Sequence, residues 1–217
     1  MADVIRDFFA LRLEKAREAL EKNRFEAFAV PDCASAKALV LDKILGPMGK
    51  IRVGLGGSVT LVQTGVYERL KQMESVELLD TYDKAASNEE KNELRRQSLM
   101  ADVFLTGTNA VTEEGVLVNL DMVGNRVGAM TFGPRKVVVI AGRNKLVPDL
   151  QAGMDRIKEY AACVNTMRLN KKTPCAETGF CHDCSSPDRI CNTWTIHEKC
   201  FPKGRIAVVL VNEDLGF

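Results

Sequence analysis

Four cysteines gathered in one short segment are the residues of this sequence best suited to chemistry. Within residues 173–191 they follow the spacing Cys-x5-Cys-x2-Cys-x6-Cys. The central Cys-x2-Cys pair lets two sulfurs reach one ion from a tight turn, and Gly179 and Pro187 can bend the flanking chain toward it. Four thiolates suit either tetrahedral zinc or an iron–sulfur cluster. We therefore expect one metal centre, with iron–sulfur and zinc both open, at Cys175, Cys181, Cys184 and Cys191.

The other cysteines are expected to play lesser parts. Seven cysteines are an odd number, which argues against a complete disulfide framework. Buried packing thiols are the alternative reading, but they have no reason to gather in a segment rich in Pro and Gly. His182, beside Cys181, is expected at the edge of the site, and Cys200 is a substitute ligand. Cys33 and Cys163 are predicted to be packing residues.

A glycine-rich loop at residues 53–60 follows a predicted strand and opens a predicted helix. Backbone N–H groups and the helix dipole can hold an anion at such a place. The loop lacks the Gly-Lys-Ser/Thr ending of a P-loop and the strict dinucleotide fingerprint. A tight turn without a ligand is the alternative. The candidate ligand-binding residues are Gly54, Gly56, Gly57, Ser58 and Thr60.

Three further loops also leave the ends of apolar strands. In open α/β sheets ligands collect at the carboxyl ends of the strands, so these loops are expected to face one crevice with the glycine loop. Arg143 and Lys145 would donate to a phosphate or carboxylate, although charges in loops are often merely solvated. The candidates here are Gly107, Thr108, Asn109, Asn119, Asp121, Gly124, Asn125, Arg126, Arg143, Asn144 and Lys145.

Familiar catalytic sets are scarce. The chain has two histidines, and neither lies in a context typical of a Ser-His-Asp triad. Glu113 and Glu114 are the carboxylates best placed for acid–base or nucleophilic work, with Lys145 as their cationic partner. A Glu pair in a turn is more commonly surface charge, so these three remain candidates only.

The elements that would position these residues alternate along the chain. An amphipathic helix is predicted at 4–20, with apolar residues at helical spacing. Short apolar runs then alternate with helical patterns, which predicts an α/β fold with a mainly parallel sheet and helices on both faces. The predicted strands are 25–30, 51–53, 76–79, 103–105, 116–120, 137–140 and 206–210, and the later helices are 35–45, 60–73, 88–100 and 149–163.

Residues 165–204 do not continue this alternation of strands and helices. The segment has no sustained period and holds five of the seven cysteines. A structureless stretch of this length is improbable in a compact domain unless something other than a hydrophobic core organises it, and a metal would do so. We expect one domain over residues 1–217 with a Cys-rich insertion at about 165–204.

The composition of the chain limits the classes of partner that we expect it to bind. Thirty Lys and Arg against 29 Asp and Glu give a net charge of +1, without the charge runs of nucleic-acid-binding or membrane-binding tails. No apolar stretch has the length of a signal sequence or a membrane span. We expect a cytoplasmic protein with no nucleic-acid or membrane partner and a small anionic ligand. Homo-oligomerisation is left open.

Taken together, the motifs resemble the lactate-utilisation (LUD) domain family over nearly the whole chain. The resemblance rests on several segments in order: 54–58, 106–110, 119–121, 124–126, 142–145, 173–191 and 204–217. It implies a fold similar to the sugar-phosphate isomerase and CoA-transferase superfamily. It also implies a role in the oxidation of lactate or another organic acid alongside iron–sulfur oxidoreductase partner proteins.

Two other functions stay open beside this one. The first is a free-standing isomerase or acyl/CoA-transfer enzyme, but relatives of the isomerase type carry an acidic residue in a Gly-Ala-Asp loop where this chain has Thr108, Asn109 and Ala110. The second is a non-catalytic interaction module that zinc braces. Proteins of one fold can catalyse many different reactions, so the geometry of the site is needed to choose between these three functions.

Overall fold

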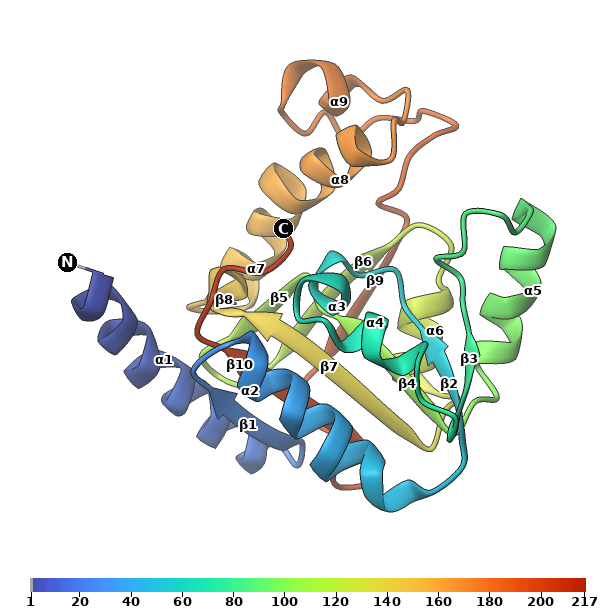
Figure 1. The fold of residues 1–217 in the computed structure, drawn as a ribbon. Helices are drawn as coiled ribbons and strands as arrows, with labels where there is room; N and C mark the ends of the chain where they lie inside the picture. The colour runs from blue at the N-terminus through green and yellow to red at the C-terminus, as the bar shows by residue number, and fades with distance from the viewer. Residues whose placement is uncertain (1) are drawn as a thin grey trace.

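A sheet of six parallel strands lies at the centre of the protein, as the computed structural model of residues 2–217 shows (Figure 1). All its neighbouring pairs run parallel. The predicted α/β fold with a mainly parallel sheet is therefore confirmed. The strands, in order across the sheet, are β1 (Glu26–Val30), β10 (Ile206–Val211), β7 (Lys136–Gly142), β4 (Val103–Gly107), β2 (Ile51–Leu55) and β3 (Val76–Leu79).

Helices cover both faces because both faces of the strands are apolar. In β7, Val138 and Ile140 pack into one core and Val137 and Val139 into the other. The first core is closed by α2 (Cys33–Ala38), η1 (Leu39–Leu45), α3 (Val59–Gln63) and α4 (Val66–Leu70). The second is closed by α1 (Ala2–Lys22), α5 (Asn88–Ser98) and α6 (Asn125–Thr131).

Two predicted helices differ in detail from the structure. The expected helix 60–73 is broken at Gly65, whose φ of +70° begins a second helix, α4. The expected helix 149–163 is longer, because α7 (Leu150–Arg156), η4 (Ile157–Ala161) and α8 (Ala162–Arg168) run on as one rod. A short η2 (Gly46–Met48) closes the turn before β2.

A second sheet holds the strand expected at 116–120. Gly115, with φ +79°, reverses the chain after β5 (Ala110–Thr112), so β6 (Leu117–Asp121) folds back antiparallel to it. A Cβ at Gly115 would also meet the backbone of α1 at 2.6 Å. The sheet order is β8 (Leu146–Val147), β5, β6 and β9 (Thr193–His197).

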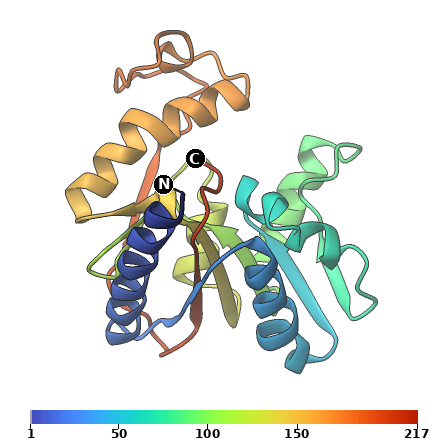
Figure 2. The same cartoon turned by 60° about the vertical axis from the view of Figure 1, so that its left-hand side comes forward.

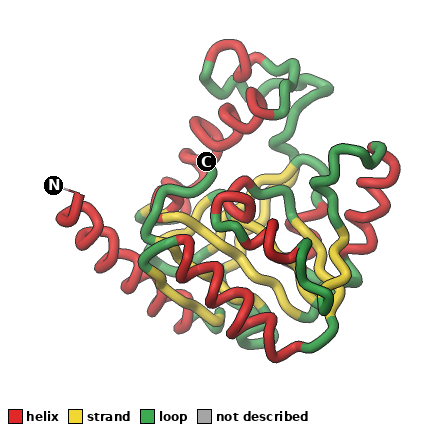
Figure 3. Tube along the Cα trace, in the orientation of Figure 1, coloured by secondary structure: helices red, strands yellow, loops and turns green. Residues whose placement is uncertain are grey.

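The Cys-rich segment stands above the central sheet at the end of the α7–η4–α8 rod (Figure 2). It contains α9 (Pro174–Thr178) and then a long loop before β9 (Figure 3). Strand β9 lies within the stretch expected to be irregular, and it is tied to β6 in antiparallel register. The segment is thus attached to the second sheet.

Among the described residues no helix is long and apolar enough to cross a membrane.

Candidate functional site

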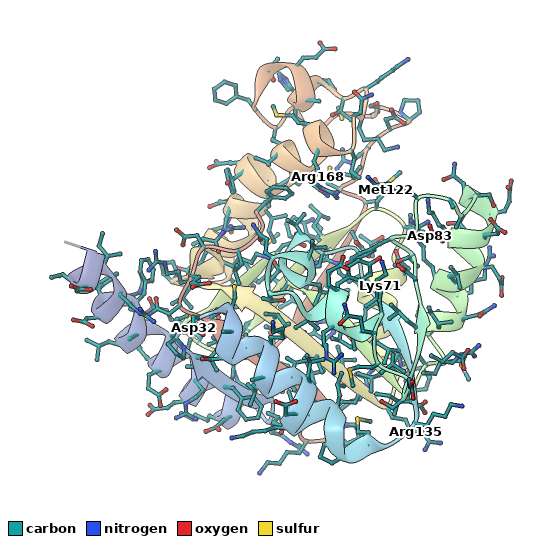
Figure 4. All side chains as sticks on the ribbon, in the orientation of Figure 1. Asp32, Lys71, Asp83, Met122, Arg135 and Arg168 are labelled. Atoms are coloured by element: carbon teal, nitrogen blue, oxygen red, sulfur yellow. The ribbon has the colours of Figure 1, made fainter. Side chains whose placement is uncertain are left out.

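The carboxyl ends of five parallel strands open into one cavity of about 260 Å³. The turns after β2, β3 and β4 supply one side, and η3 (Arg143–Lys145) after β7 and the C-terminal residues after β10 supply another. The end of β6 and the rod of α8 close it from above. Arg168 of α8 and Met122 after β6, both of which border the cavity, are labelled in Figure 4. We call this cavity the crevice.

Tyr82 holds the glycine loop against the crevice. Its hydroxyl donates to the carbonyl of Gly56 at 2.6 Å and accepts from the N–H of Ser58 at 2.8 Å. The Ser58 side chain makes no capping hydrogen bond to α3 and lines the crevice. Helix α3 has five residues, so the attraction of an anion depends mainly on nearby side-chain charges and little on a helix dipole.

Lys145 lies at the base of the crevice and is buried, with 4% of its surface exposed. Its Nζ donates to Thr60 Oγ1 at 3.1 Å, and no carboxylate is paired with it among the residues described. Burial, with a smaller effect from the charges of the nearby Arg156 and Arg126, lowers the pKa of Lys145 to about 7. Near neutral pH the amine can therefore accept a proton, attack a carbonyl carbon, or become cationic when an anion enters.

Arg126 organises the wall beside Lys145. Its guanidinium donates to Asn119 Oδ1 at 3.0 Å, to Asn109 Oδ1 at 2.7 Å and to the carbonyl of Leu120 at 3.1 Å. Asp121 lies 3.5 Å away as its ionic partner. This buried network joins α6, β6 and the loop after β4 in one rigid unit.

The charge of the crevice is strongly positive. Its lining holds Arg95, Arg126 and Arg168, and also Lys145 when its amine is protonated, against one carboxylate side chain, Asp121. Asp121 is already engaged by Arg126, and the N–H of Val127 donates to it at 3.4 Å. The unbalanced positive charge suits a small anion.

Most of the ligand-binding candidates come together here. The lining includes Gly57, Ser58, Thr60, Gly107, Thr108, Asn109, Asp121, Asn125, Arg126 and Lys145. The candidates outside the lining are Gly54, Gly56, Asn119, Gly124, Arg143, Asn144, Glu113 and Glu114. Asn119 does not line the crevice, but its side-chain oxygen accepts a hydrogen bond from Arg126, which does.

The candidates outside the lining have other contacts. A Cβ at Gly54 would lie 2.6 Å from the Ser98 Cβ, so this glycine allows α5 to approach β2. Glu113 forms an ion pair with Arg12, and with Lys15 at 3.2 Å, on α1. These cations lower the pKa of Glu113, with the hydrogen bond from Arg12 as the largest cause, so it is a poor proton acceptor.

The cysteines line a second, smaller cavity of about 20 Å³ beneath the loop that precedes β9. Five thiols border it: Cys163, Cys175, Cys181, Cys184 and Cys191. The four predicted ligands are therefore neighbours in space, and Cys163, expected to pack elsewhere, joins them. Within residues 2–217 no group of three or more His, Cys, Asp or Glu side chains is already arranged to coordinate an ion.

Hydrogen bonds surround Cys175. Its Sγ lies 3.3 Å from Thr173 Oγ1 and 3.5 Å from Thr166 Oγ1. Burial alone would raise the pKa of Cys175, but these hydroxyls and the Cys163 thiol outweigh it and lower the pKa below its usual value. Burial raises the pKa of Cys163 to about 11. Cys33 and Cys200 lie away from this cavity.

Comparison with known proteins agrees with the motifs. The LUD domain family matches residues 13–211. The chain belongs to the LUD domain family. This makes it a lactate-utilisation-related protein of unknown activity. No curated protein matches the sequence.

Several solved structures are similar to this LUD-domain protein. One of them is a crystal structure of a DUF162 family protein from Deinococcus radiodurans, 13% identical, with a TM-score of 0.48. The alignment covers 94% of this chain and 97% of that one.

Several residues of the LUD-domain crevice were not singled out from the sequence. Tyr82, Arg95, Arg168 and Phe217 all line it, yet each lies in a turn, helix or terminus without a motif. Arg168 Cζ lies 5.9 Å from the centre of the Phe217 ring. This cation–π contact holds the last residue of the chain against α8. The four residues come from the turn after β3, from α5, from α8 and from the end of the chain, and only the tertiary fold brings them together, so no local pattern marks them.

Replacing Tyr82 with Phe should destabilise this LUD-domain protein by about 1–3 kcal/mol. The change leaves the Gly56 carbonyl and the Ser58 N–H without their shared partner. Urea unfolding followed by circular dichroism measures the loss. The matched control is Tyr160→Phe, since Tyr160 is half exposed on the rod and should change stability little. Equal losses in the two variants would contradict the role given to Tyr82.

Proposed function

We propose that this LUD-domain protein binds a small organic or phosphorylated anion in the crevice, as a component of lactate or other organic-acid oxidation that works with iron–sulfur oxidoreductase partners. The observation that carries the proposal is the buried Lys145, which lies beside Arg126 with a free approach from the crevice. Burying an amine among arginines is costly, and an anion between them offsets that cost.

The crevice favours a ligand with one compact anionic group. Lys145 and Ser58 lie at the base, where a carboxylate or phosphate oxygen can accept from both. Arg168 and Arg95 line the upper part, where they can meet a second charge or a hydroxyl. A cavity of about 260 Å³ accommodates a small metabolite.

Direct binding tests the proposal. Lactate, pyruvate and inorganic phosphate would each be titrated into the protein while the fluorescence of Trp194, its single tryptophan, is recorded. Trp194 pairs in register with Leu120, which lines the crevice. At least one probe should bind, and Lys145→Met should weaken it by about 100-fold, or roughly 2.7 kcal/mol. The exposed Lys43 provides the control Lys43→Met, which should bind as the unmodified protein does.

Anion affinity should fall as pH rises above about 7. Below that pH Lys145 is protonated and attracts the anion, and above it the amine is neutral. A bound anion raises the pKa of Lys145, so binding takes up one proton between the two pKa values. Calorimetric titration from pH 6 to 9 should show a loss approaching tenfold per pH unit, and Lys145→Met should remove this dependence. A flat profile in the unmodified protein would count against Lys145 as the anion's partner.

A second candidate function is an enzyme of isomerase or acyl/CoA-transfer type. It is favoured by the pKa of about 7 at Lys145, which suits a base or nucleophile. Glu113 is engaged by α1, so the carboxylate side chain that the crevice lining offers is Asp121, which pairs with Arg126. Turnover of an acyl-CoA or sugar phosphate that Lys145→Met abolishes would support this function over simple binding.

The proposal extends to the cysteines. We infer that their cavity holds a metal centre, for which the sequence leaves iron–sulfur and zinc open. Support comes from the gathering of the four predicted ligands around one cavity. A centre there would brace the Cys-rich segment through thiolate bonds. If neither anions nor metabolites bind, a metal-braced interaction module is the function that remains.

A further inference from the structure

The cavity beneath the Cys-rich loop is of the size of one ion. Its volume of about 20 Å³ corresponds to little more than a single water-sized sphere. An iron–sulfur cubane, with its four irons and four sulfides, needs several times that space. Zinc bound by four sulfurs at about 2.3 Å is compact enough.

Arg189 closes the loop that carries two of the thiols. Its Nε donates to the carbonyl of Cys191 at 3.0 Å, and another guanidinium nitrogen donates to the carbonyl of Cys184. One side chain thus holds both ends of the intervening segment, so that the two cysteines face the same cavity. The third guanidinium nitrogen bonds Asp183 at 2.8 Å.

Positive charge surrounds these sulfurs. Lys158 and Arg189 both line the cavity, and they share one carboxylate, that of Asp183. Four thiolates around a divalent ion carry a net charge of about −2, which the uncompensated cation stabilises. Neutral thiols would gain no stabilisation from this excess of positive charge.

We propose that this cavity closes around a single zinc ion bound by Cys175, Cys181, Cys184 and Cys191, and that the ion fixes the roof of the anion crevice. The proposal rests on the proposed function and deepens it, because it chooses the metal and gives it a role in ligand binding. The sulfurs draw together as the ion binds and the thiol protons pass to solvent, as is usual for structural zinc.

Cys163 lies in the same cavity but is assigned a different part. Its Sγ donates to the carbonyl of Lys158 at 3.3 Å on its own helical rod. It lies on the rod and is buried, with 3% exposed, whereas the other four thiols are more exposed and lie on the segment from α9 to the loop before β9. Because the proton of Cys163 is engaged by the Lys158 carbonyl, Cys163 leaves the four coordination positions to the other thiols.

The ion would act on the crevice through the chain around Cys191. Ile190 and Cys191 border both cavities. The next residue, Asn192, donates its N–H to the carbonyl of Asp121 at 2.9 Å and its side-chain amide to that of Met122 at 3.1 Å. Asp121 and Met122 line the crevice. Fixing Cys191 therefore fixes the upper wall against which an anion would bind.

Metal content is the first test. Protein purified without air should be colourless and contain one zinc per chain, measured by elemental analysis together with a visible spectrum. Cobalt titrated into zinc-free protein should give the intense sulfur-to-cobalt absorption of tetrathiolate coordination. A brown protein with four irons per chain, or cobalt bound without that absorption, would overturn the assignment of zinc.

Single substitutions identify the ligands. Cys181→Ser and Cys184→Ser should each weaken zinc binding by at least 100-fold, while Cys163→Ser and the distant Cys33→Ser keep one zinc per chain. Loss of zinc from Cys163→Ser would overturn the choice of four ligands. Because a variant that fails to fold also fails to bind, the circular dichroism of the central sheet is recorded for each, and the cobalt spectrum of the unmodified protein stands independently of any variant.

The link to the crevice is tested by anion affinity. Phosphate or lactate, whichever binds the zinc-loaded protein, should bind about tenfold more weakly after the zinc is removed by a chelator, and affinity should return when zinc is restored. Equal affinity with and without zinc would overturn the link. Anion binding that is absent even with zinc bound would instead refute the proposed function, and anion binding without any zinc uptake would refute only the metal site.

Discussion

Arg126→Met lowers the free energy of unfolding by about 3–5 kcal/mol, the expected cost of breaking a buried charged network at one partner. Arg126 is buried, and its guanidinium satisfies oxygens of Asn109, Asn119 and Leu120 within 3.1 Å. Met fills similar space but donates nothing, so these acceptors and the Asp121 carboxylate lose their partner.

Urea unfolding at pH 7 measures this loss, with the slope checked to confirm that the unfolded state is unchanged. Arg52→Met is the matched control, because Arg52 pairs with Glu77 at 2.9 Å on an exposed surface. An exposed pair contributes about 0–1 kcal/mol. Arg126→Lys should recover only part of the loss, since an ammonium group cannot reproduce the planar set of donors. Similar losses from Arg126→Met and Arg52→Met would show that the network does not hold the crevice together.

Lys145→Met should make the protein more stable at pH 6 while it abolishes tight anion binding. In the folded state the pKa of Lys145 is about 7, against an ordinary value of 10.5. The unfolded chain therefore holds more protons between these two pH values, and the stability of the unmodified protein rises with pH across them. Below about pH 7 both states are charged, and the folded state bears the full cost of the buried charge, on the order of 5 kcal/mol.

The gain from Lys145→Met should be smaller than that cost, about 2–3 kcal/mol at pH 6, because the buried Thr60 hydroxyl loses its partner. The gain should shrink as pH rises, reach zero near pH 9, and become a loss of about 2 kcal/mol near pH 10.5, where the lysine is neutral in both states and only the hydrogen bond to Thr60 is missing. Urea unfolding at pH 6, 8 and 10 follows the trend, with Lys43→Met as the exposed control. A difference that does not vary with pH would mean that Lys145 titrates normally in the folded protein.

Stability gained by removing a buried lysine would be consistent with a binding role. A residue that lowers the stability of the free protein is retained when it has a function. For Lys145 that function would be to bind the anion in the crevice. The zinc proposal follows the same logic at the other cavity, where cations and thiols are held close together ahead of the ion.

Local patterns predicted the central strands because their residues are apolar on both faces, as in β4, β7 and β10. The glycine loop was predicted for a comparable reason, since its turn follows a strand directly. The second sheet was harder. Strand β5 has three residues and β8 two, too few for any period, and their pairing depends on the reversal at Gly115.

The sequence by itself determined the α/β class, the loops that follow the carboxyl ends of the strands, and the four clustered cysteines. Each of these features depends on the spacing of residues that are close together in the sequence. Tertiary structure decided the rest. It joined Tyr82, Arg168 and Phe217 to the crevice, moved Glu113 to an ion pair with α1, and brought Cys163 beside Cys175. The positions of Arg168 and Cys163 depend on the α8 rod, that of Glu113 on α1, and that of Tyr82 on the turn after β3. The physical reason is that burial and charge, which set the pKa of Lys145, belong to the packed chain and to no segment of it.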